Sequence, residues 1–193
     1  MGWGLGTNLA GLNMPHALSD LHSRWKLPPI APYRGEAGVP YVVDRLIGRV
    51  DEVSQASRQP IALVGWSLGG FMAREAARER PAQISQVITL GSPVIGGPKY
   101  TLAAKAFNRR QYDLDWVERV IADREERPTT VPITAVVSPS DGVVSYLAAL
   151  DHHSPAVEHV QLDVPPLVFP YNGAVWSVIA KALQAMEFGS GRA

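Results

Sequence analysis

A serine stands between glycines where an apolar run gives way to a helical pattern. Gly65-Trp66-Ser67-Leu68-Gly69 directly follows the run Ile61–Val64. This spacing is typical of a sharp strand-to-helix turn that exposes a nucleophilic hydroxyl. We expect both glycines to be needed because a Cβ there would collide with the neighbouring strand or helix. Such a serine forms an acyl intermediate once a base takes its proton. The alternative is a tight turn that happens to contain serine.

Three further residues fit the same chemistry. The backbone N–H of Leu68 begins the predicted helix and would donate to an oxyanion, aided by the helix dipole. Trp66 would line an acyl pocket, with core packing as the alternative. Asp141 follows an apolar strand at the sheet edge where functional groups gather, and we expect it to be the acid that orients a histidine. Its alternative role is that of a turn residue or helix N-cap.

The elements that would position these residues alternate along the chain. Four short apolar segments predict strands over 61–64, 86–90, 131–137 and 157–164. Helical spacing predicts helices over 39–57, 67–80, 143–150 and 172–186. This order indicates an α/β protein with a mostly parallel sheet, and the apolar strands suggest burial on both faces.

The remaining segments are read as additions to a single domain over residues 1–193. Residues 96–130 form an insertion with expected helices over 102–109 and 116–124, which would act as a cap that selects the substrate. Residues 1–40 are rich in glycine and proline, with a short helix predicted over 14–25 and a loop over 26–40.

Composition narrows the classes of partner. Lys+Arg and Asp+Glu both number 18, so no basic excess indicates nucleic acid or an acidic membrane surface. The absence of cysteine excludes disulfides and thiolate chemistry, and no His/Asp/Glu set has metal-ligand spacing, so we expect neither metal nor cofactor. No apolar run spans a bilayer, and the first residues lack signal-peptide features. We therefore expect a cytoplasmic protein, although a secreted mature form would look the same.

Several stretches together resemble the α/β-hydrolase superfamily, in particular its bacterial esterase- and lipase-like members. They are GWGLGTN at the start, VGWSLGGFMAREAARERPAQISQVITLGSP, PITAVVSPSDGVV, and VEHVQL with VFPYNGAVWSVIAKAL near the end. The resemblance implies a Ser-Asp-His hydrolase of esters that needs no cofactor. It also implies an earlier strand, a glycine-rich loop and a helix before Gly2–Gly6, so the chain is expected to be reduced at its N-terminal side, unless Gly2–Gly6 substitutes for that loop.

The catalytic histidine is the main departure from this resemblance. The family places it in the loop after the last strand, where this sequence has Pro166. Without an imidazole the serine hydroxyl stays protonated, and loss of general-base help costs ~10² to 10⁴ in rate. The other candidates are His16, His22 and His159. His152 and His153 are expected at the opposite end of the sheet.

Two functions from different classes therefore remain open. One is an esterase-like serine hydrolase that acts on a small-molecule ester or acyl substrate. The other is a weak or inactive hydrolase-fold protein that binds an acyl or hydrophobic ligand, or a partner protein; a fragment that needs a second chain is a third reading. The strand at 61–64 would lie near an uncovered sheet edge, which favours a homodimer. We expect a dimer by light scattering at micromolar concentration, and a monomer would count against it.

Overall fold

The computed structural model describes residues 38–102, 104–105 and 113–189. The expected helix over 14–25, residues 26–37 of the expected loop and most of the expected helix over 102–109 lie outside these residues, as do His16 and His22. None of the described helices is both long and apolar enough to cross a membrane.

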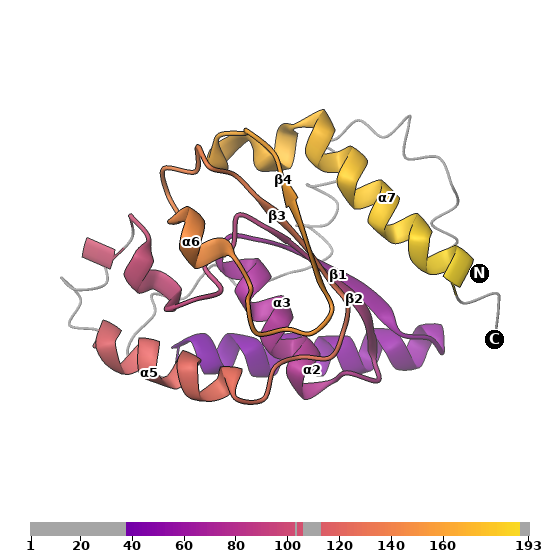
Figure 1. Cartoon of the computed structure of the whole chain (residues 1–193). Coiled ribbons are helices and arrows are strands. Elements are labelled where there is room, and N and C mark those ends of the chain that lie inside the picture. The colour runs from indigo at the N-terminus through magenta and orange to yellow at the C-terminus, as the bar shows by residue number, and fades with distance from the viewer. Residues whose placement is uncertain (1–37, 103, 106–112, 190–193) are drawn as a thin grey trace.

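A parallel sheet of four strands forms the centre of the molecule (Figure 1). Its strands lie side by side in chain order: β1 (Ile61–Trp66), β2 (Ile84–Leu90), β3 (Ile133–Val137) and β4 (Val157–Gln161). Parallel neighbours need crossover connections, and helices supply them. The helix α3 (Leu68–Glu79) connects β1 to β2, α5 (Leu114–Glu125) lies between β2 and β3, and α6 (Tyr146–Ala149) lies between β3 and β4. Two further helices flank the strands in the chain: α2 (Gly38–Ser57) precedes β1 and α7 (Gly173–Gly189) follows β4. The predicted α/β class is confirmed.

The sheet separates two apolar clusters. On one face, Val50 of α2 and Ala76 of α3 pack with Val87 of β2. On the other face, Ile88 of the same strand packs with Ile179 of α7. Because successive side chains of a strand point to opposite faces, adjacent residues of β2 enter different clusters. Figure 1 shows the same arrangement, with α2 and α3 on one side of the sheet and α7 on the other.

Burial on both faces holds for the central strands and is wrong for the outer ones. All residues of β3 are buried, whereas Val64 and Trp66 of β1 are 47% and 43% exposed. Within the described part of the chain, β1 and β4 are the edges of the sheet, and α7 covers β2 and β3 rather than β1. The open side of β1 matches the expectation of an edge, while the homodimer through it stays a prediction.

The joint between β1 and α3 is too tight for side chains at two positions. A Cβ on Gly65 would lie 2.5 Å from the carbonyl carbon of Gly69, and one on Gly70 would lie 2.9 Å from the carbonyl oxygen of Gly65. A Cβ on Gly69 would meet no described atom within 4 Å. The expectation that both motif glycines are required by space is therefore wrong for Gly69. The close approach involves Gly65 and Gly70.

A buried ion network fastens α3 to the rest of the fold. Arg74, which is 1% exposed, donates to Asp151 Oδ2 at 2.7 Å and to Glu125 Oε1 of α5 at 3.3 Å. Arg78 donates to the same Glu125 oxygen at 3.0 Å and to Glu75 at 3.2 Å. Burial raises the pKa of Asp151, but the Arg74 charge and hydrogen bonds from residues 153 and 154 outweigh it and hold that pKa at about 2.

The network predicts a loss of stability in acid. The folded-state pKa of Asp151 lies below the ordinary value of about 4, so the carboxylate stabilises the fold above pH 4 and this contribution disappears as pH falls through 2. We expect about 2 kcal/mol of unfolding free energy to be lost between pH 5 and pH 2 through this group. Urea unfolding of wild type and Asp151→Asn across that range measures it. The variant should be less stable at pH 7 and show a shallower acid dependence, whereas Asp44→Asn on the exposed face of α2 should behave like wild type. Equal acid slopes for wild type and Asp151→Asn would contradict the assignment.

The two motif glycines should respond in opposite ways to alanine. Gly65→Ala forces backbone atoms apart at the β1–α3 joint and should lower the unfolding free energy by about 2 kcal/mol or more. Gly69→Ala places a methyl group in open space within a helix, where it should be neutral or stabilising by up to about 1 kcal/mol. Thermal unfolding of both variants checks this, and similar losses in the two would refute the packing account.

Candidate active site

Ser67 has the backbone of a strained turn at the carboxyl end of β1. Its φ of 52° and ψ of −126° lie outside the helix and strand regions, and among the described residues only Arg58 is another non-glycine with positive φ. Such a conformation costs on the order of 1–3 kcal/mol and persists where the surroundings hold it. The Ser67 N–H donates to Leu90 O at 2.9 Å, and the Ser67 carbonyl accepts from Gly70 N–H at 3.0 Å. Both the sheet and the helix therefore fix the half-buried serine.

Leu68 is the first residue of α3. The first N–H groups of a helix have no partner within it, and they carry the positive end of the helix dipole. The Leu68 N–H lies in this turn directly beside Ser67, where it would face negative charge that develops on a substrate oxygen. Leu68 thus stays the predicted oxyanion donor next to Ser67.

Asp141 follows β3 and uses only one of its carboxylate oxygens. Oδ1 accepts the N–H groups of Val143 at 2.8 Å and Val144 at 2.9 Å, so the residue makes the turn that sequence reasoning offered as its alternative role. Oδ2 is buried and has no hydrogen-bond partner among the described residues. A buried acceptor without a donor costs about 1–3 kcal/mol, so this oxygen is an unusual feature of the site.

The unpaired oxygen faces the end of β2, next to Ser67. Gly91 follows Leu90, the residue whose carbonyl binds Ser67, and its own N–H donates to Val136 O at 2.9 Å. A Cβ on Gly91 would lie 2.9 Å from Asp141 Oδ2. The serine and the carboxylate thus approach the end of β2 from its two neighbouring strands, as predicted from their places after β1 and β3.

An aromatic ring occupies the space beside this oxygen. The Cε2 atom of Phe169 lies 2.9 Å from the same Cβ position of Gly91, and the side chain is completely buried. Phe169 belongs to η3 (Pro166–Tyr171), the short helix in the loop after β4. Ser138 Oγ accepts the Val164 N–H at 3.1 Å and ties the start of this loop to the end of β3. Position in the sequence points to Pro166 as the expected histidine place, whereas the side chain beside Asp141 Oδ2 is that of Phe169.

The described histidines do not approach Ser67. His159 lies in β4 and pairs with Ala135 of β3, which is in register with Thr89 of β2 and Gly65 of β1. It therefore lies three strand spacings, about 14 Å, from β1. Its Nε2 accepts the Asp151 N–H at 3.0 Å. Exposed His152 and His153 lie before β4, at its amino end, as expected. His159 was a predicted base, and the structure places it at a separate site.

Trp66 is not a core residue. Its side chain is 43% exposed and directly precedes Ser67. Exposure removes the alternative of core packing and leaves the indole available to a ligand.

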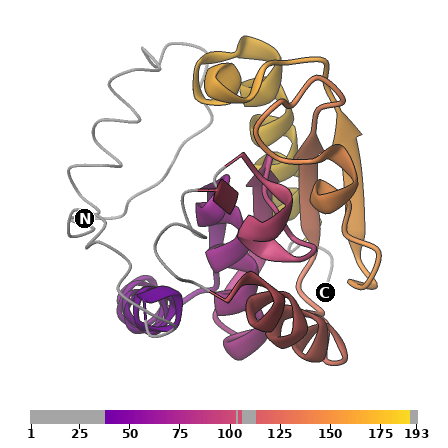
Figure 2. The same cartoon turned by 90° about the vertical axis from the view of Figure 1, so that its left-hand side faces the viewer.

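The insertion begins near the site and then leaves it. The insertion starts with η2 (Gly97–Tyr100). Two hydrogen bonds connect this start to the segment just after Asp141: the Ser145 N–H donates to Tyr100 O at 3.0 Å, and the Leu102 N–H donates to Val143 O at 2.8 Å. The chain then continues into α5, which lies beside α3 (Figure 2). The ion pairs of Glu125 with Arg74 and Arg78 agree with that placement. Only the η2 end of the described insertion therefore borders the site.

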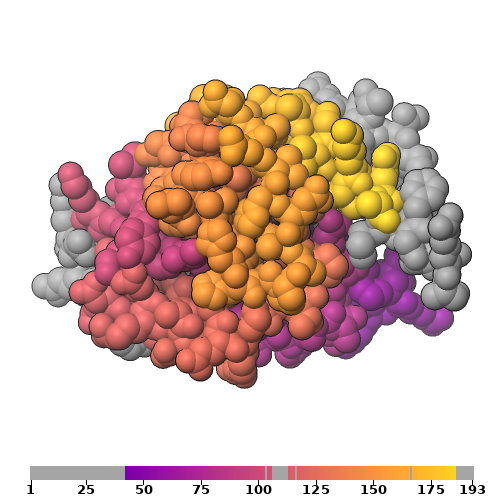
Figure 3. All heavy atoms as spheres, viewed as in Figure 1, coloured from indigo at the N-terminus to yellow at the C-terminus, as the bar shows by residue number. Residues whose placement is uncertain are grey.

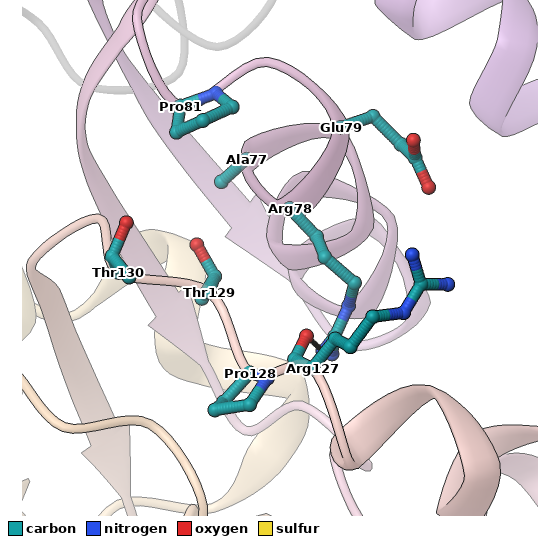
Figure 4. A pocket seen from close by; sticks show the side chains of 8 residues that line it. All are labelled: Ala77, Arg78, Glu79, Pro81, Arg127, Pro128, Thr129 and Thr130. Carbon is teal, nitrogen blue, oxygen red and sulfur yellow. Dashed lines mark hydrogen bonds between the residues drawn. The ribbon is translucent and has the colours of Figure 1, made fainter.

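Other surfaces lie away from Ser67. A pocket of about 300 Å³ opens at the far end of α3 (Figure 4) and is lined by Ala77, Arg78, Glu79, Pro81, Arg127, Pro128, Thr129 and Thr130. In the space-filling view (Figure 3), the segment around β4 covers the front of the molecule between α5 and α7. The pocket and this face belong to parts of the fold that the motif residues do not reach.

Sequence reasoning missed Gly91, Ser138 and Phe169. None of them belongs to a motif of fixed spacing, and their importance depends on contacts between the ends of different strands. The only available signal was a glycine and a serine directly after two predicted strands, and an aromatic residue in the loop after the last one.

Comparisons with known proteins agree with this architecture. A family model described as the alpha/beta hydrolase fold matches residues 41–142, more than half of the chain. Among curated proteins, no sequence matches.

Solved structures with the same fold include hydrolases of low sequence identity. Alpha/beta hydrolase domain-containing protein 10 from mouse superposes with a TM-score of 0.58 at 19% identity, over 77% of this chain and 69% of that one. An esterase from Pyrococcus furiosus gives 0.54 at 16% identity, over 75% and 61%. A monoacylglycerol lipase from Paleococcus ferrophilus gives 0.52 at 13% identity, over 75% and 74%. The chain thus spans less than two thirds of that esterase, and identities this low speak for the fold alone. Together with the family match, they show that the protein belongs to the alpha/beta hydrolase family.

Proposed function

We propose that the protein is a serine hydrolase that cleaves carboxylic esters through an acyl-enzyme at Ser67. The observation that carries the proposal is the positive φ of Ser67, a non-glycine residue, at the β1–α3 turn. A strained non-glycine conformation held by both neighbouring elements is typical of a functional position, and here it bears a nucleophilic side chain. The esterase and lipase among the similar structures support the same reaction class.

The reaction follows from the residues around the turn. Ser67 Oγ attacks the acyl carbon while a histidine takes its proton, and the Leu68 N–H donates to the oxyanion that forms. The histidine passes the proton to the leaving alcohol. Water then attacks the acyl-enzyme, which releases the acid and restores the serine. His16 and His22 are the predicted bases, and Asp141 is the predicted acid. This mechanism uses no metal or cofactor, and the substrate is a small ester or acyl compound.

Two observations favour a second function. The described histidines lie away from Ser67, and Phe169 lies beside the unpaired Asp141 oxygen. A protein of this kind would keep the site but turn over slowly, and would bind an acyl or hydrophobic ligand, or a partner protein, near Trp66. Fold alone does not decide between the two.

A fluorophosphonate probe distinguishes them. Wild type should be labelled and should hydrolyse short p-nitrophenyl esters, whereas Ser67→Ala should do neither because it lacks the nucleophile. Of His16→Ala and His22→Ala, the one that removes the base should lower kcat by ~10² to 10⁴. Mass spectrometry of the probe adduct locates the label.

The control keeps the fold and removes only the chemistry. Ser67→Ala should unfold at a similar temperature to wild type and still bind a p-nitrophenyl ester, measured as quenching of tryptophan fluorescence. A folded wild type that is neither labelled nor active, yet binds the ester, would favour the binding function over the enzyme.

A further inference from the structure

The two oxygens of the Asp141 carboxylate have different surroundings. Oδ1 receives two backbone N–H groups, so the orientation of the carboxylate is fixed. Oδ2 is buried with no described partner. A carboxylate that served only the turn could leave its second oxygen in water at little cost, whereas a buried unpaired oxygen is destabilising. The arrangement is explained if the oxygen faces a position meant for an N–H group.

That position lies between Asp141 and Ser67. Asp141 Oδ2 points at Gly91, and the residue before Gly91 accepts the Ser67 N–H. Gly91 has a φ of 51° and no side chain, so the space above the end of β2 is left to groups from elsewhere. The described side chain that enters it is the ring of Phe169.

We infer that Phe169 occupies the place from which an imidazole would connect Asp141 to Ser67. A histidine ring carries nitrogens on two sides, and in a Ser-His-Asp arrangement Nδ1–H binds the carboxylate while Nε2 receives the serine proton. A phenyl ring is of similar size and has neither group. It therefore leaves Oδ2 unpaired and supplies no base to Ser67 from the loop after β4.

The ring is held firmly in this place. Phe169 is fully buried and packs with Ile88 and Leu90 of β2, Val136 of β3 and Val175 of α7. The hydrogen bond from Val164 N–H to Ser138 Oγ fixes the start of the same loop. Because the backbone and the ring plane are already set, a ring of similar size at residue 169 should take the same orientation.

The test is the variant Phe169→His. The inference rests on the proposed function only in taking Ser67 as the nucleophile. The introduced imidazole should accept the Ser67 hydroxyl proton as Oγ attacks the ester and return it to the leaving alcohol. We expect kcat/KM for p-nitrophenyl acetate, and the rate of fluorophosphonate labelling, to rise by ~10² to 10⁴ over wild type, with a new pH dependence near the imidazole pKa. Adding Ser67→Ala should abolish the gain, and adding Asp141→Asn should lower it at least about tenfold.

Two control measurements test whether the gain depends on where the histidine is introduced and not only on its presence. Val168→His puts the same side chain on the neighbouring, 40% exposed residue and should give no gain. In Phe169→His, nuclear magnetic resonance titration should show an imidazole pKa that falls when Asp141→Asn is added, because the carboxylate favours the charged form of the ring. The histidine of Val168→His should titrate without this dependence on Asp141.

The outcomes decide the inference independently of the natural activity. A folded Phe169→His that shows neither a rate gain nor an Asp141-dependent imidazole pKa overturns it. An inactive wild type with an active Phe169→His supports the inference and refutes the proposed enzyme function. An active wild type whose rate does not rise in Phe169→His supports the enzyme function and refutes the inference. If Phe169→His does not fold, Phe169→Ala with added imidazole provides the second test. A saturable, imidazole-dependent rate absent from Val168→Ala supports the inference, and its absence from both overturns it.

Discussion

The close approach of β1 to α3 is the constraint on which the site depends. Gly65 and Gly70 allow the strand and helix backbones to meet, and Ser67 between them takes a backbone conformation that a non-glycine residue adopts only under restraint. The same turn places the Leu68 N–H at the helix start and connects Ser67 to Leu90 of the next strand. A larger separation of β1 and α3 would disrupt the turn, the place of the Leu68 N–H and the Ser67–Leu90 hydrogen bond together. The predicted chemistry of this chain thus depends first on how the backbones of β1 and α3 meet, because that contact positions the reacting groups.

The two ends of α3 have different characters. At its start lie the strained serine and helix N–H groups without a partner inside the helix, both features that cost stability. Along its second half lie paired buried charges from Arg74, Arg78 and Glu125, packed against α5. Buried ion pairs are weak evidence of net stability, but removal of one member is strongly destabilising, so they specify how the elements meet. The ion pairs thus position the second half of α3, while its first residues lie next to the proposed nucleophile Ser67.

Much of the fold was predictable because its signals are local. The apolar runs ending at Val64 and Val137 predicted strands, and the glycines around Ser67 predicted the turn; each depends on neighbours in sequence. The exposure of Trp66 was not predictable, because it depends on which strands α7 covers. The place of Phe169 was not predictable either: it follows from contacts between the loop after β4 and the end of β2, some 80 residues earlier in the chain, and no periodicity records such a contact. Position in the sequence alone therefore points to Pro166.

The ion network also bears on the order of folding. Arg74 meets Glu125 and Asp151 across sequence separations of 51 and 77 residues. Closing such long loops costs entropy before any contact forms, so we expect these partners to meet after β1, α3 and β2 have assembled from nearby segments.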